Sequence, residues 1–121
     1  MHIIIAGSRT LRDGRDIWDL VESLPRDTTV ITGGAQGADA FGTGYAIARG
    51  LKVLVFKPNW DKYGPSAGFK RNEQMLVFGD PDAVFVYYDG SVRSNGSAHI
   101  AELAQTKDFG INVVETFVHP N

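Results

Sequence analysis

The sequence contains no cysteine and no long hydrophobic run, and each absence excludes a class of protein. Without cysteine, the 121-residue chain has no disulfide framework, no thiolate metal site and no cysteine nucleophile. No apolar stretch is long enough to cross a bilayer, and no basic segment followed by an apolar one opens the chain, so we expect a cytoplasmic protein without a membrane partner. No spacing of the three histidines indicates a metal site or a Ser–His–Asp triad, and we expect neither a metal nor another cofactor.

An excess of positive charge is also absent, since the net charge is −2. This balance argues against broad nucleic-acid binding. The basic residues are unevenly distributed, however: residues 57–71 carry four basic side chains against one acidic one, and residues 9–15 carry three arginines against one aspartate. A local basic rim on an acidic protein fits a small anionic ligand better than a nucleic-acid duplex.

Apolar strand-like runs alternate with helical patterns along the whole chain. The expected strands are residues 2–6, 29–32, 52–56, 83–88 and 111–117, and the expected helices are residues 17–24, 38–49, 68–78 and 97–109. The strands are nearly continuous apolar runs, which is typical of a parallel sheet covered on both faces. We therefore predict a single domain, residues 1–121, with an α/β, three-layer, Rossmann-like doubly wound fold around a mostly parallel five-stranded sheet.

Glycine-rich or polar turns follow three of these strands, at residues 7–10, 33–39 and 89–97. In an open α/β sheet the carboxyl ends of the strands share one edge, where helix N-termini point backbone N–H groups at an anion. The turns therefore predict a site for a ligand that carries phosphate.

The first turn is Gly7, Ser8, Arg9 and Thr10. It lacks the G-x-G-x-x-G spacing, which counts against NAD or FAD. Its glycine would let the backbone approach a ligand, and the three residues after it would supply hydrogen-bond donors. A tight turn with an exposed arginine explains the same residues equally well.

The second turn places Gly33, Gly34 and Gly37 where a strand meets a helix. Missing side chains there would make room for a phosphate or a ribose, which we favour over a turn that needs glycine only for packing. Asp39 lies just inside the helix, where the dipole favours a carboxylate. Because that carboxylate would repel a phosphate at the helix terminus, we expect it to cap N–H groups or to accept from a sugar hydroxyl.

The expected helix 68–78 carries an amide in its apolar arc. At ~100° per residue, Asn72 falls between Met75 and Leu76. An unsatisfied buried amide costs ~1–3 kcal/mol, so Asn72 either braces a neighbouring loop or touches the ligand. Arg71 adjoins the basic segment, and for it we favour an anion contact.

The turn after the fourth expected strand, which we call the fourth turn, ends in Ser94, Asn95, Gly96 and Ser97. Hydroxyls, a flexible glycine and free N–H groups can form an anion nest, and the same residues can cap the last helix. In the preceding loop 59–67, Trp60 or Tyr63 could lie against a nucleobase, or these aromatic side chains could simply cover the sheet edge.

Taken together, these segments resemble the YspA-type branch of the SLOG superfamily, which also includes the DNA-processing protein A (Smf) domain and the LOG phosphoribohydrolases. The resemblance spans nearly the whole chain and is carried by residues 6–10, 32–39, 60–68, 71–72 and 75–76. It implies a Rossmann-like fold and a pocket for a nucleotide or nucleotide-derived ligand. By position, the implied contacts are Gly7, Ser8, Arg9, Gly33, Gly34, Gly37, Arg71, Asn72 and the turn 94–97.

The LOG pattern Pro-Gly-Gly-x-Gly-Thr-x-x-Glu is only partly present. Gly96 and Ser97 align with its Gly-Thr, but the position of the glutamate, which serves hydrolysis of the N-glycosidic bond, falls on Ile100. Glu102 lies two residues further, about 200° around the helix. The anion-binding turns therefore survive without that catalytic group.

The leading hypothesis is a module that binds a nucleotide-type small molecule for sensing or sequestration, with catalysis left open. One alternative is a LOG-like nucleoside 5′-monophosphate phosphoribohydrolase, for which the candidate carboxylates are Asp39, Asp89 and Glu102. A second alternative is single-stranded DNA binding, as in the DNA-processing relatives. Because relatives of this fold often pair through helices, the resemblance also allows a homodimer or a higher homo-oligomer.

Overall fold

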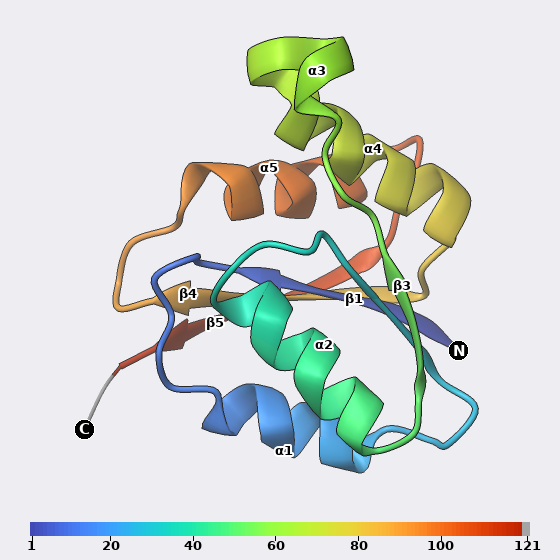
Figure 1. The fold of residues 1–121 in the computed structure, drawn as a ribbon, viewed down its shortest axis with the longest axis vertical. Coiled ribbons are helices and arrows are strands. Elements are labelled where there is room, and N and C mark those ends of the chain that lie inside the picture. The colour runs from blue at the N-terminus through green and yellow to red at the C-terminus, as the bar shows by residue number, and fades with distance from the viewer. Residues whose placement is uncertain (120–121) are drawn as a thin grey trace.

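A computed structural model describes residues 1–119 of the chain, and strands alternate with helices throughout this range (Figure 1). The strands are β1 (His2–Gly7), β2 (Thr29–Thr32), β3 (Lys52–Val55), β4 (Ala83–Asp89) and β5 (Asn112–Val118). The helices are α1 (Arg15–Ser23), α2 (Ala38–Ala48), α3 (Trp60–Tyr63), α4 (Ala67–Gly79) and α5 (Asn95–Ala104), and a 3₁₀ turn η1 (Gly64–Ser66) joins α3 to α4.

The five strands form one sheet in the order β3-β2-β1-β4-β5, and every neighbouring pair is parallel. Helices α1 and α2 cover one face of this sheet and α4 and α5 cover the other, while α3 lies beyond α4 at the outside of that layer (Figure 1). The prediction of a three-layer, Rossmann-like α/β fold is confirmed, with a sheet that is parallel throughout. The order reverses direction at β1, so the turns after β1 and β4 meet at the switch point where open α/β sheets bind ligands.

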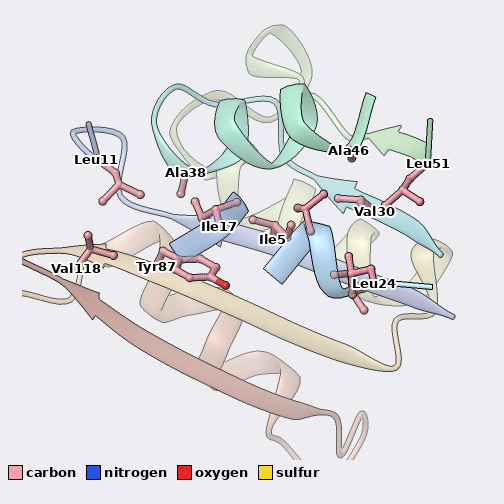
Figure 2. Packing of buried hydrophobic residues seen from close by; sticks show 12 residues of the cluster. Ile5, Leu11, Ile17, Leu24, Val30, Ala38, Ala46, Leu51, Tyr87 and Val118 are labelled. Carbon is pink, nitrogen blue, oxygen red and sulfur yellow. The ribbon is translucent and has the colours of Figure 1, made fainter. Parts of the chain in front are cut away.

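Alternation along β1 divides the apolar core between the two faces of the sheet. Ile3 and Ile5 belong to the cluster under α1 and α2, whereas Ile4 belongs to the cluster under α4 and α5. Figure 2 shows the first cluster, in which Ile5 and Val30 of the strands face the helical side chains. All of these residues are buried, so the sheet and its four covering helices form one rigid support for the turns at its edge.

Three predicted features differ from the structure. Helix α5 begins at Asn95, two residues earlier than predicted. It ends at Ala104, five residues earlier than predicted, because the residues after Ala104 form turns. Residues 60–66, predicted as loop, are helical. Strand β3 is not covered on both faces: Leu54 is 42% exposed, because β3 lies at the edge of the sheet. None of the helices within residues 1–119 is long and apolar enough to span a membrane.

Candidate functional site

The turns after β1 and β4 are joined directly. The backbone N–H of Ser8 donates to the Tyr87 carbonyl oxygen at 2.9 Å, and the backbone N–H of Asp89 donates to Ser8 Oγ at 3.0 Å. Thr10 Oγ1 donates to Asp89 Oδ2 at 2.7 Å. A side chain on Gly7 would collide with the Tyr87 carbonyl oxygen, so glycine is needed here for the close approach of two strands. These contacts fix the first turn against the end of β4.

Several backbone N–H groups of the second turn already donate to other atoms of the protein. Asp39 Oδ2 accepts from the backbone N–H groups of Gly33 and Ala35 at 3.1 and 3.2 Å, so Asp39 does cap N–H groups. The first N–H of α2, that of Ala38, donates to the Ser8 carbonyl oxygen at 3.2 Å. Because three amides of this turn already have protein partners, the start of α2 is a poorer place for a phosphate than the glycines suggest.

The three glycines of the second turn give room to protein atoms. A Cβ on Gly33 would collide with the Arg71 guanidinium, one on Gly37 with the Ser8 carbonyl oxygen, and one on Gly34 would lie 2.9 Å from Val55. Gly34 and Gly37 also have positive φ angles of 71° and 70°. Packing therefore accounts for these glycines, in place of the room for a ligand that the sequence favours.

Arg71 and Asp39 flank Gly33 and influence one another. Arg71 donates from Nη1 to the Gly33 carbonyl oxygen and from Nε to Asn72 Oδ1 at 3.0 Å. Burial raises the pKa of Asp39, against the effect of its two backbone donors and of the nearby Arg71 and Arg9 cations. Burial likewise lowers the pKa of Arg71, against the attraction of Asp39. The guanidinium stays charged at neutral pH, so this corner of the site holds a cation next to a buried carboxyl group.

The raised pKa of Asp39 predicts a pH-dependent stability difference between the parent protein and Asp39→Asn. Above pH 3.8 the unfolded carboxyl loses its proton while the folded one still holds it. The free energy of unfolding of the parent should therefore fall, relative to Asp39→Asn, as pH rises from 3.8 through the folded pKa, by ~1.4 kcal/mol per pH unit of that window. Urea denaturation of both proteins between pH 3 and 7 measures the difference, in which the other carboxyl groups cancel. A difference that grows with pH would mean that the pKa is lowered instead.

Asn72 ties α4 to the start of α5. Its Nδ2 donates to the Gly96 carbonyl oxygen at 3.2 Å and lies 3.1 Å from His99 Nδ1, while its Oδ1 accepts from Arg71. Since both Nδ2 hydrogens are donors, His99 Nδ1 must accept, and the ring is neutral. Burial lowers the pKa of His99, which favours the same state. Asn72 thus braces the fourth turn, as one of its two predicted roles required.

Among the turn segments at this edge of the sheet, residues 94–97 of the fourth turn, at the N-terminus of α5, have the fewest backbone N–H groups bonded to other atoms of residues 1–119. Its first intrahelical bond runs from the Ala98 N–H to the Ser94 carbonyl oxygen at 2.8 Å, so the N–H groups of Asn95, Gly96 and Ser97 precede it. Ser94 is the N-cap residue, but its side chain accepts no capping bond. Its buried Oγ has no hydrogen-bond partner within the described residues. Gly96 has no protein atom of residues 1–119 within 4 Å of where a Cβ would lie.

One cavity of about 490 Å³ opens between these turns and α4. The predicted site residues on its wall are Gly7, Ser8, Arg9, Thr10, Asp39, Arg71, Asn72, Ser94, Gly96 and Ser97. Within the part of the chain that the structure describes, this wall does not include the predicted residues Gly33, Gly34, Gly37, Asn95 and Glu102. Glu102 points elsewhere, with its side chain 68% exposed and 3.6 Å from Arg93, whereas Ile100 is buried on the cavity wall.

Several residues of the wall are not among the site residues predicted from the sequence. They include Ala35, Pro65, Phe69, Met75 and Val92. Asp89, one of the three candidate carboxylates, also lines the wall and accepts from Thr10 Oγ1. The rings of Phe69 and His99 pack together with their centroids 4.2 Å apart and their planes tilted by 30°. The position of Phe69, three residues before Asn72, could have indicated a second aromatic group at the site. Within residues 1–119 no three His, Cys, Asp or Glu residues are grouped so that they could hold a metal ion.

Comparisons with known proteins agree with this architecture. The model of the YspA, cpYpsA-related SLOG family matches residues 1–63. No curated protein matches the sequence significantly. Among solved structures, DNA processing protein A (DprA) from Streptococcus pneumoniae is similar, with a TM-score of 0.57 and 14% sequence identity. The match covers 95% of this chain and 58% of that one, so this chain spans little more than half the length of that protein, and the similarity concerns the fold alone.

Proposed function

Because the chain belongs to the YspA, cpYpsA-related SLOG family, we propose that it binds a nucleotide or nucleotide-derived phosphate compound in the cavity at the carboxyl edge of the sheet. Family membership supports a nucleotide-related ligand. The proposal adds the location of the phosphate, at the N-terminus of α5, and a role in sensing or sequestering the ligand without hydrolysis by the LOG mechanism.

The observation that carries the proposal is the unused hydrogen-bonding capacity at the start of α5. Three N–H groups precede the first intrahelical bond there, and the buried Ser94 Oγ has no partner among the described residues. A buried hydroxyl without a partner costs about 1–3 kcal/mol, which a hydrogen bond to a phosphate oxygen would recover if the Ser94 side chain turned toward the cavity that this residue lines. The dipole of a ten-residue helix adds attraction for an anion.

The surrounding charges favour the same placement. Arg9 lines the cavity, and its guanidinium makes no hydrogen bond or ion pair with residues 1–119, so it can neutralise a phosphate without disrupting the fold. Arg71 adds a second cation on the wall. Asp39 would repel a phosphate at the start of α2 but could accept from a ribose hydroxyl, which orients the sugar toward β1 and β2.

The test is isothermal titration of the protein with AMP, ADP, cyclic AMP, ADP-ribose, ribose 5-phosphate and inorganic phosphate. We expect at least one organic phosphate to bind below millimolar concentration. Arg9→Gln should weaken it about tenfold to a hundredfold, because a charge-assisted hydrogen bond contributes about 1.5–3 kcal/mol. Thermal stability should be unchanged in this variant. If none of the compounds binds below millimolar concentration, the proposal is wrong.

A phosphoribohydrolase activity is the second candidate, because two carboxyl groups, those of Asp39 and Asp89, line the cavity. Ile100 occupies the position of the LOG glutamate, so one of these two would have to act on the sugar. Chromatography of AMP incubated with the protein would detect released adenine. Release that Asp39→Asn or Asp89→Asn abolishes would support hydrolysis; binding without release supports the sensing role.

A further inference from the structure

The part of the cavity wall that α3 and α4 contribute carries aromatic side chains, and it differs in character from the N–H groups at the start of α5. Trp60 and Phe69 both line the cavity, and they are 51% and 49% exposed. Tyr63, the other aromatic residue of α3, is not on the wall within the described residues. Of the two aromatic side chains that could lie against a nucleobase, Trp60 is therefore the one on the cavity wall.

Both aromatic side chains are held in place while part of each ring remains open. Phe69 packs on the neutral ring of His99 at 4.2 Å between centroids, with the two planes tilted by 30°, and Asn72 hydrogen-bonds to that imidazole. Trp60 starts the short helix α3, which Asn59 caps by accepting from the Lys62 N–H at 3.1 Å. Its ring lies 4.0 Å from the position of a Cβ on Gly68, over the first turn of α4. Half-exposed aromatic rings on the wall of a cavity that also presents polar groups are typical of a stacking surface.

We infer that Trp60 and Phe69 form the platform for the nucleobase of the bound ligand, so that the ligand class is a mononucleotide rather than a simple sugar phosphate. This inference rests on the proposed function. A single cavity of about 490 Å³ contains both the platform and the α5 N-terminus, and it is in the range of pockets that enclose one small molecule. Purines, with the larger ring system, bind more tightly than pyrimidines on such a surface.

The test compares AMP with ribose 5-phosphate by titration calorimetry on the parent protein and on Trp60→Ala, a variant that removes an exposed side chain. AMP should bind at least tenfold more tightly than ribose 5-phosphate to the parent, since base stacking on an aromatic ring has effects of this size. In Trp60→Ala the affinity for AMP should fall toward that for ribose 5-phosphate, which itself should not change. Phe69→Ala should act in the same direction, and Phe78→Ala, which removes a 73% exposed ring from the far end of α4, should have no effect.

A second readout reports on Trp60 itself. The chain has two tryptophans, and the other, Trp18, packs on Tyr45 at 5.1 Å between centroids, on the opposite face of the sheet. In a Trp18→Phe background, AMP should quench the remaining tryptophan fluorescence, and saturating ribose 5-phosphate should not.

The outcomes distinguish this inference from the proposed function. If ribose 5-phosphate and AMP bind equally, or if Trp60→Ala leaves their ratio unchanged, the base platform is wrong while the phosphate site stands. If neither binds, the mononucleotide assignment is wrong, and the phosphate site is wrong as well if none of the other compounds in the panel binds. If a single-stranded oligonucleotide binds more tightly than AMP with a steep dependence on salt, the aromatic surface serves nucleic acid, and the mononucleotide assignment is overturned.

Discussion

Gly37→Ala should destabilise the protein by about 3–4 kcal/mol and lower its melting temperature by roughly 10–15 °C. Two effects add at this position. Its backbone angles, φ 70° and ψ −124°, lie where only glycine is comfortable. A Cβ would also collide with the Ser8 carbonyl oxygen and lie 2.7 Å from backbone atoms of Arg9. Since neither backbone can move without disturbing the turn after β1, the strain cannot be relieved locally.

The matched control is Gly44→Ala. Gly44 lies in the middle of α2, is exposed, and has no described atom within 4 Å of a Cβ position. Alanine there should stabilise the protein by ~0.5–1 kcal/mol through helix propensity alone. Urea and thermal denaturation of both variants measure the contrast. Equal effects of the two substitutions would show that the turn is not held against Ser8 and Arg9 as described.

Gly96→Asp should reduce nucleotide affinity about a hundredfold without unfolding the protein. The added carboxylate would lie at the start of α5, among the N–H groups proposed to hold the phosphate. Repulsion between two charges about 5 Å apart, at the dielectric of a protein surface, is about 3 kcal/mol. The fold should tolerate the change, because the Cβ meets no described atom and an acidic residue in the first turn is favoured by the helix dipole.

Gly44→Asp is the control for the change in net charge, because it adds the same charge on α2, outside the cavity. Calorimetric titration with AMP should give the parent affinity for this variant and the loss for Gly96→Asp, with melting temperatures measured in parallel. Unchanged affinity in Gly96→Asp would place the phosphate away from the α5 N-terminus, even if the ligand still bound in the cavity.

Much of the fold follows from local patterns. Apolar runs at β1 and β4 predict buried parallel strands, and the glycines and prolines between the elements mark where each strand or helix ends. The boundary of α5 was predicted less well, because the apolar pattern continues to residue 109 and only the turn geometry after Ala104 ends the helix. Exposure of β3 was also missed, since a sequence does not tell an edge strand from a central one when both are apolar.

The sequence by itself determined the parallel sheet, the glycine turns at its carboxyl edge, and the presence of an amide in the apolar arc of α4. These three features follow from the periodicity of apolar residues and from backbone conformations that only glycine adopts readily. Both are properties of residues that are close together in the sequence. Only the tertiary structure decided which amides stay free. Hydrogen bonds from Gly33, Ala35 and Ala38 to residues distant in sequence or across the turn occupy the second turn, while the start of α5 is left open. The capping by Asp39 is local and could be predicted from the sequence. The bond from Ala38 to Ser8 depends on packing between segments that are distant in sequence, which no local pattern predicts.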